Sequence, residues 1–381
     1  MTLSQRVPAL LRRARALLGL TPGPADRLAP AELRHAARAV EALHEGLVGG
    51  RGLARAGTYD QPAHLGAYLL WWWPQTYAKV RAVLALARSA GALRALPGRP
   101  RILDVAAGPA PAALALLDAL GGTALALDAS AAALSEARAL SEDLVRTQKA
   151  DLRRGLPPLE GDFDLAVVAN ALSELPGASR VPLIQALPVA DAGAVLLVEP
   201  ALRETGRVLL EVRDGLLRGG GWMAAAPCLT QRPCPALAHP RDWCTAQHAW
   251  EPPPHVAQLA AELGLRADEE LAYAPLVLTR GVAPPPREVW RVVGVPQPEK
   301  GKKRLFVCSD EGRVPLGRLD RDVAPGNADF DRLGRGDLVM LGGVAPKGDG
   351  LRIGPHSQVR RLDRLEGSPG SPAGGDVSER R

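Results

Sequence analysis

The feature of this sequence that most restricts its fold is a regular alternation of short apolar runs and helical segments from about residue 100 onwards. Four runs are short enough to be buried parallel strands, namely residues 102–105, 124–127, 165–169 and 195–198. Three segments between them have helical spacing, namely residues 110–120, 131–144 and 182–187. This series predicts a doubly wound parallel sheet. Two more strands, around residues 270–273 and 276–280, are expected to close it.

A turn of small residues follows the first predicted strand. Asp104 lies within this strand, Ala106 and Gly108 form the turn, and a helix follows. Such a turn brings backbone amides and the start of a helix close to a ligand. Asp128 ends the second strand, where a carboxylate can bind both hydroxyls of a ribose. The pattern therefore predicts a nucleotide site at this edge of the sheet.

Two later residues are expected at the same edge. Asp151 lies where a third strand ends and can reach an adenine amine, and Asn170 follows the fourth strand. We therefore predict an α/β fold of the class I S-adenosylmethionine methyltransferase type, with Asp104, Ala106, Gly108, Asp128, Asp151 and Asn170 as cofactor-binding residues. Alanines at 106 and 110 replace expected glycines, and their two methyl groups can block a close ligand approach. A Rossmann-shaped scaffold with an empty pocket is the alternative.

The region before the predicted sheet, residues 1–95, has a helical pattern. An amphipathic first helix is expected because residues 7, 10, 11 and 14 are apolar, and Pro30 opens a second helix over 31–44. A glycine-rich break at 49–52 and a helical stretch over 67–93, interrupted by Pro74, follow. Residues 71–73 are all tryptophan and cannot share one helical face. Either one or two pack inward and one is exposed, or they form a stacking surface for RNA or a partner protein.

The chain has only four cysteines, and their positions predict a metal site. Cys228, Cys234 and Cys244 lie in a proline-rich insertion at about 222–255, and Cys308 lies far downstream. Four thiolates can hold a tetrahedral zinc ion or a four-iron, four-sulfur cluster. The spacing lacks the paired CxxC motifs of common zinc ribbons, whereas His248, four residues after Cys244, and the nearby His239 favour zinc. Four unrelated buried thiols are the remaining alternative.

The sequence predicts further domains around the sheet. The Rossmann-like domain is expected over 96–282, a linker at 284–286, a small β domain over 283–365, with a barrel as one alternative arrangement, and a disordered tail at 366–381. Strands of the β domain are expected at 289–295, 304–307, 313–316 and 337–341.

The charge is basic and uneven. Residues 1–56 carry nine arginines against four acids, and residues 281–381 carry 18 basic residues against 14 acidic ones. Basic ends suit contact with a polyanion such as RNA, although an arginine-rich composition gives the same count. No uninterrupted apolar run is long enough to cross a membrane, and no heptads indicate self-association. We expect a cytoplasmic monomer without a membrane partner.

Several segments resemble a known family. Residues 74–78 (PQTYA), 103–109 (LDVAAGP), 171–175 (ALSEL) and 198–200 (VEP) are similar to motifs of the Rsm-type small-ribosomal-subunit proteins, the methyltransferase-like ribosome assembly factors of bacteria and mitochondria. The cysteine pattern is similar as well, with three in the insertion and one in the C-terminal domain. The resemblance covers roughly residues 60 to 340.

This resemblance implies a factor that associates with small-subunit rRNA and proteins. It also implies that Cys228, Cys234, Cys244 and Cys308 bind an iron–sulfur cluster, with the basic N-terminal helices and the β domain contacting RNA phosphates. No catalytic residue can be nominated, so methyltransferase activity is left open. One alternative is an active S-adenosylmethionine-dependent rRNA methyltransferase, and another is a zinc-stabilised RNA-binding module with a dead pocket.

Overall fold

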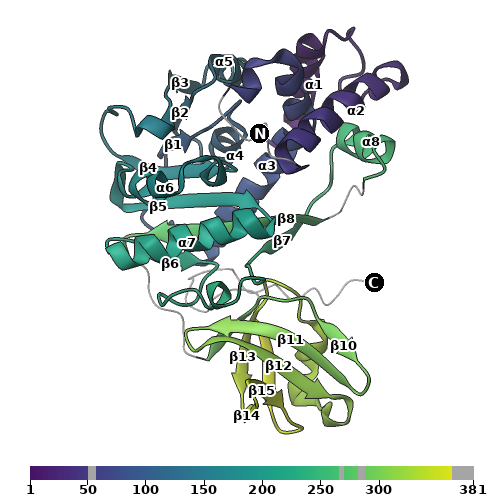
Figure 1. Cartoon of the computed structure of the whole chain (residues 1–381), viewed down its shortest axis with the longest axis vertical. Helices are drawn as coiled ribbons and strands as arrows, with labels where there is room; N and C mark the ends of the chain where they lie inside the picture. Colours follow the sequence, from purple (N-terminus) through teal and green to yellow (C-terminus); the bar gives the residue numbers. More distant parts are fainter. Residues whose placement is uncertain (50–56, 266–269, 282–287, 363–381) are drawn as a thin grey trace, which may run out of the picture.

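The computed structural model describes residues 1–49, 57–265, 270–281 and 288–362. The linker expected at 284–286 and the tail expected at 366–381 lie outside these residues, as does most of the glycine-rich break at 49–52. Three layers follow one another in Figure 1: N-terminal helices, a central sheet with helices, and a C-terminal β domain at the far end. No helix within the described residues is both long and apolar enough to span a membrane.

Three helices form the N-terminal layer: α1 (Leu3–Leu18), α2 (Pro30–His44) and α3 (Pro62–Ser89). The first helix begins with a capping box between Thr2 and Gln5, and its apolar face is buried as expected. The third helix continues through Pro74, so the expected interruption is wrong. Proline removes the amide that would donate to the Leu70 carbonyl, and the buried ring of His255 lies beside that carbonyl.

The central sheet has the strand order β3-β2-β1-β4-β5-β8-β6, with β7 paired to β8. Its strands are β1 (Arg101–Val105), β2 (Thr123–Asp128), β3 (Val145–Lys149), β4 (Phe163–Ala169), β5 (Val189–Pro200), β6 (Met223–Ala226), β7 (Ala246–Ala249) and β8 (Glu270–Thr279). The first five strands pair in parallel, and β8 runs antiparallel to β5, β6 and β7. The order reverses between β1 and β4, which is where α/β sheets bind ligands.

The helices of this layer connect the strands, and α7 lies across the sheet in Figure 1. They are α4 (Pro111–Leu120), α5 (Ala131–Ser141), α6 (Gly177–Gln185), α7 (Arg203–Gly219) and α8 (Pro254–Glu262). The helix expected over 131–144 ends at Ser141 because Glu142 and Asp143 have φ angles of 52° and 61°. The helix expected over 182–187 begins earlier, at Gly177. The two strands expected over 270–280 are one strand, β8, because its hydrogen bonding to β5 is unbroken.

The C-terminal domain is a second sheet with the order β14-β15-β12-β11-β9-β13-β16, and β10 pairs with β11. Its strands are β9 (Val289–Val292), β10 (Gln297–Glu299), β11 (Lys302–Ser309), β12 (Gly312–Leu319), β13 (Leu338–Gly342), β14 (Ala345–Lys347), β15 (Gly350–Ile353) and β16 (Gln358–Leu362). The four expected strands are present, although β9 ends three residues early. Phe330 and the alternate apolar residues of these strands form a separate core.

Candidate functional site

A cavity of about 240 Å³ lies at the carboxyl edge of β1, β2 and β4, beneath α3. All six residues predicted to bind a cofactor line it: Asp104, Ala106, Gly108, Asp128, Asp151 and Asn170. They come from four consecutive strand ends, which the parallel order of the sheet brings to one edge. The topology therefore brings all six predicted residues to one cavity.

The turn after β1 keeps the backbone of a glycine-rich loop although two of its glycines are replaced. Ala106, Gly108 and Ala110 have φ angles of 57°, 54° and 54°, which place all three in the left-handed region. The indole Nε1 of Trp73 donates a hydrogen bond of 3.1 Å to the Pro109 carbonyl and so holds the turn against α3. Of these two alanines, Ala106 lines the cavity and its methyl group narrows it, whereas Ala110 is fully buried and does not line it.

Asp104 has one satisfied and one unsatisfied carboxylate oxygen. Its Oδ2 accepts a hydrogen bond of 2.8 Å from the Ala113 amide, whereas its buried Oδ1 has no partner. Burial raises the pKa of Asp104 to about 7, and the nearby Asp128 carboxylate adds to the rise. This oxygen needs a hydrogen-bond donor, and a cationic donor within the cavity would stabilise the ionised form.

Asp128 connects the turn to the next helix. Its Oδ2 accepts a bond of 2.8 Å from the Gly108 amide, and its Oδ1 accepts one of 2.8 Å from the Ser130 amide. Burial raises the pKa of Asp128, and the Asp60 carboxylate contributes to the rise. The Asp128 side chain is thus oriented towards the cavity by backbone amides, with lone pairs left to accept further hydrogen bonds.

The last two predicted residues have side-chain partners of their own. Asp151 accepts two hydrogen bonds of 2.9 Å from the guanidinium of Arg153, which lowers the pKa of Asp151. Asn170 has a φ of 58° and donates its side-chain amide to the Thr76 hydroxyl at 3.1 Å. A base bound at Asp151 would therefore share this carboxylate with Arg153 or displace it.

One face of α3 completes the cavity, and the sequence analysis missed it. Tyr68, Trp72, Thr76 and Lys79 line the cavity at spacings of three and four residues, together with Gln75. Burial lowers the pKa of Lys79 to about 8. These polar and aromatic residues recur at helical spacing within an apolar helix, and that spacing is the signal that could have revealed them.

The three consecutive tryptophans have different environments. Trp73 is fully buried, and Trp71 and Trp72 are half-buried. Trp72 faces the cavity and stacks with Tyr68 at a ring separation of 6.3 Å. The expectation of one exposed tryptophan is wrong because α3 is covered on several sides by α1, α2 and the sheet. Of the three, Trp73 is enclosed, and Trp71 and Trp72 keep only part of their surface exposed.

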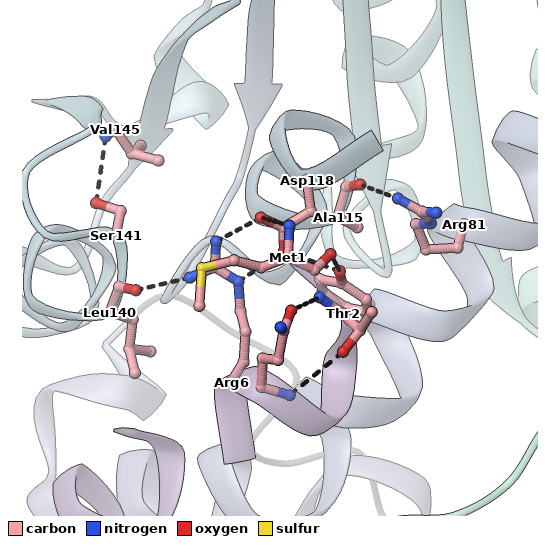
Figure 2. Close-up of polar contacts among 11 residues, drawn as sticks. Met1, Thr2, Arg6, Arg81, Ala115, Asp118, Leu140, Ser141 and Val145 are labelled. Atoms are coloured by element: carbon pink, nitrogen blue, oxygen red, sulfur yellow. Dashed lines mark hydrogen bonds and ion pairs between the residues drawn. The ribbon is translucent and has the colours of Figure 1, made fainter. Parts of the chain in front are cut away.

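Arginines of the first helix are used within the protein. Arg6 donates two hydrogen bonds of 2.7 Å to Asp118 of α4 and one of 3.0 Å to the Leu140 carbonyl, and Figure 2 shows this cluster. Arg13 pairs with Glu136, and Arg15 pairs with Glu32. These three guanidinium groups hold α1 to its neighbours; those of Arg6 and Arg15 are buried, whereas the Arg13 side chain is 37% exposed.

Exposed cations lie elsewhere, on and directly after β3, which is an edge strand of the central sheet. Arg146 and Lys149 belong to the strand itself, and Arg153 and Arg154 follow it. Arg153 and Arg154 share the Asp151 carboxylate, and within the described parts of the chain no carboxylate pairs with Arg146 or Lys149. This edge carries net positive charge beside the mouth of the cavity.

All four cysteines line a second cavity, at the junction between the central layer and the β domain. Cys228 follows β6, Cys234 and Cys244 lie in the insertion, and Cys308 lies on β11. The thiols are half-buried and form no disulfide. Burial, together with the charges of the neighbouring thiols, raises the pKa of both Cys234 and Cys308 to about 12. The tertiary structure thus brings together thiols from segments far apart in sequence.

The cysteine cavity does not have the geometry of a single-ion site. Among the described residues, no three Cys, His, Asp or Glu side chains lie close enough together to hold one metal ion. His239 and His248, which supported the zinc alternative, do not line the cavity. His248 lies on β7, whose pairing with β8 places it outside the cavity lining. The cavity lining therefore contains the four cysteines without either histidine.

The central sheet and its cavity define a class of protein. A parallel sheet that ends in an antiparallel strand between two others, with a nucleotide-type cavity at its switch point, is the class I S-adenosylmethionine methyltransferase fold. Solved structures with this fold align with the chain at low similarity. A TehB-like methyltransferase from Corynebacterium glutamicum has 18% identity, 51% and 87% coverage of this chain and its own, and a TM-score of 0.32. The plantazolicin methyltransferase BpumL is 10% identical to the chain. The alignment covers 65% of this chain and 98% of BpumL, with a TM-score of 0.35.

A match between the sequence and a family model shows the family of this chain. The model of the family described as mitochondrial small ribosomal subunit Rsm22 matches residues 62–317, which is more than half of the chain. The chain belongs to this family. No curated protein matches it. The matched segment contains the whole cavity edge of the sheet and all four cysteines.

Proposed function

We propose that this protein is a factor of the small ribosomal subunit that binds rRNA and holds a four-iron, four-sulfur cluster on Cys228, Cys234, Cys244 and Cys308. The observation that carries the proposal is the convergence of all four thiols on one interdomain cavity. Such a cluster, when bound, supplies cross-links between the insertion and the β domain.

The donor set favours a cluster over a single zinc ion. A zinc ion requires four sulfurs at about 2.3 Å from one centre. A cubane cluster binds each cysteine at a separate iron, so its thiolates surround a larger volume. All four thiols line one cavity and no histidine lines it, which supports a ligand held by four thiolates.

The decisive test is the absorbance spectrum and metal content of the full chain purified without oxygen. We expect a broad band near about 400 nm, with iron and sulfide at about four each per chain. Replacing Cys308 by Ser should abolish the band and loosen the β domain from the central layer, measured as faster proteolysis at the junction. Colourless protein that holds one zinc ion would refute the proposal.

For rRNA, we propose the β3 edge as the binding surface. Arg146 and Lys149 are exposed and unpaired within the described residues, and the further exposed cations Arg153 and Arg154 follow the strand in sequence. Phosphate contacts release counterions, so each lost contact lowers the slope of log affinity against log salt by about 0.7 to 0.9.

A salt titration tests this surface. The double substitution Arg146→Gln with Lys149→Gln should reduce the slope by roughly one to two for small-subunit RNA. The matched control removes two exposed arginines from other surfaces, Arg218→Gln with Arg241→Gln, and should leave the slope unchanged. Equal effects of the two pairs would refute a localised surface.

A second candidate function is S-adenosylmethionine binding, with or without methyl transfer to RNA. The unpartnered Asp104 Oδ1 supports it, because an ammonium group such as that of the methionine moiety would satisfy this buried oxygen. Asp128 offers its carboxylate to the ribose, and Gly108 allows close backbone approach. The cofactor, when bound, supplies an electrophilic methyl group. Calorimetry with S-adenosylmethionine tests this, and absence of binding at millimolar cofactor would refute it.

A further inference from the structure

Cys308 lies between two arginines on neighbouring strands. It pairs with Arg291 of β9 on one side and with Arg313 of β12 on the other. Directly opposed residues of antiparallel strands project from the same face, and both arginines line the cysteine cavity. A third arginine, Arg213 of α7, lines the cavity from the central layer. The thiols are therefore enclosed by positive charge from both sides of the interdomain junction.

Two of these arginines already have carboxylate partners. Arg313 donates a hydrogen bond of 2.7 Å to Asp242, and Arg213 pairs with Asp214. Arg213 also donates to the carbonyls of Thr230 and Arg232, which fixes the insertion. The charges of Arg213 and Arg313 are thus balanced locally, whether or not the cavity holds a ligand.

Arg291 has no such balance. It is only 6% exposed, its Nε has no hydrogen-bond partner, and within the described residues no ion pair joins it to a carboxylate. An isolated buried cation is strongly unfavourable unless an anion lies nearby. The four cysteines are the anionic groups that this cavity can provide, because a metal-bound thiol is deprotonated. Four thiolates on a cubane core of charge +2 leave a net charge of −2.

We propose that Arg291 is the positive counter-charge of the cluster held by Cys228, Cys234, Cys244 and Cys308. This inference rests on the proposed cluster. Arg291 is a positioning residue: it stabilises the anionic loaded site and, because it belongs to β9, links loading of the site to docking of the β domain. In the metal-free protein Arg291 destabilises the fold, because its charge is buried without a partner.

The test compares Arg291→Gln, Arg291→Lys and the exposed control Arg321→Gln with the wild type, each as the full chain reconstituted with iron and sulfide. Loss of the positive charge disfavours the reduced cluster, which is the more negative form. We expect Arg291→Gln to lower the equilibrium constant for one-electron reduction of the cluster at least tenfold. This corresponds to a shift of the reduction potential by about 59 mV to more negative values. Arg291→Lys should retain most of the wild-type potential, and Arg321→Gln should match it.

A second measurement separates charge compensation from packing. In metal-free, reduced protein the denaturation midpoint of Arg291→Gln should equal or exceed that of the wild type, whereas its cluster should be lost to a chelator at least tenfold faster. If Arg291 only fills space, Arg291→Gln would lower the denaturation midpoint of both the metal-free and the cluster-loaded protein and leave the reduction potential unchanged. That result would overturn the inference. A wild-type chain that takes up neither iron nor sulfide would instead refute the proposed cluster itself.

Discussion

The buried ion pair between Arg6 and Asp118 gives the sharpest test of how the N-terminal helices are attached. The Asp118 carboxylate accepts two bonds from Arg6 and one of 2.8 Å from the Tyr77 hydroxyl, and the two charged side chains are 5% and 8% exposed. Figure 2 shows the arginine between α4 and the Leu140 carbonyl. Removing Asp118 leaves the buried charge of Arg6 uncompensated, at a cost of about 3–5 kcal/mol. Removing Arg6 costs less, because the N-terminal ammonium of Met1 still lies 3.5 Å from the Asp118 carboxylate.

A double-mutant cycle measures this coupling. Asp118→Asn should lower the free energy of unfolding by about 3–5 kcal/mol and Arg6→Gln by less, both measured by urea denaturation. The double variant should cost clearly less than the sum, because neither side chain then carries a buried charge. Additive effects would refute the pairing. Neither single substitution should change the salt dependence of RNA binding, since Arg6 does not reach the surface.

The same pair has a defined pH dependence. Burial alone would raise the pKa of Asp118, but hydrogen bonds from Arg6 and Tyr77 and the charge of Arg6 lower it overall. The folded carboxyl therefore has a lower pKa than the unfolded one. Its stabilisation is complete above the unfolded value, near pH 4, and is lost as the pH falls through the folded value. Asp118→Asn should remove this acid-side loss, and an unchanged acid limb would contradict the assignment.

Three further predictions concern the cofactor cavity. Ala106→Gly should tighten S-adenosylmethionine binding, and weaker binding measured by calorimetry would contradict this. It should change the free energy of unfolding by less than about 1 kcal/mol, because relief of the strained left-handed backbone of Ala106 is offset by the greater backbone entropy of unfolded glycine. Trp73→Phe removes the donor to Pro109 and should cost about 1–3 kcal/mol in urea denaturation together with cofactor affinity. Affinity for the cofactor should fall below about pH 7 as Asp104 is protonated, and Asp104→Asn should bind weakly without this pH dependence.

The sequence predicted the central sheet well because its signals are local. Buried parallel strands leave short apolar runs, and the residues at their carboxyl ends must meet at one edge whatever the packing around them. For this reason Asp104, Asp128 and Asn170 could be named in advance. The end of a helix depends on one or two backbone angles, so the termination at Ser141 could not be predicted.

Other features followed from contacts that no local pattern records. Proline at 74 normally ends a helix, yet α3 continues because the surrounding packing holds it. Arginine-rich α1 had the composition of an RNA-binding helix, but acids on α2, α4 and α5 neutralise three of its arginines. Net charge is a sum over residues, whereas availability depends on which partner each one meets.

By itself, the sequence determined the alternation of strands and helices, the strand-end carboxylates and the presence of four cysteines as a set. Only the tertiary structure decided which of these groups act together. Cys308 reaches the other three because β11 of a separate domain docks against the insertion, and Arg291 reaches it through the register of β9. The physical reason is that period and spacing are properties of one segment, while charge balance and enclosure arise only when distant segments pack together.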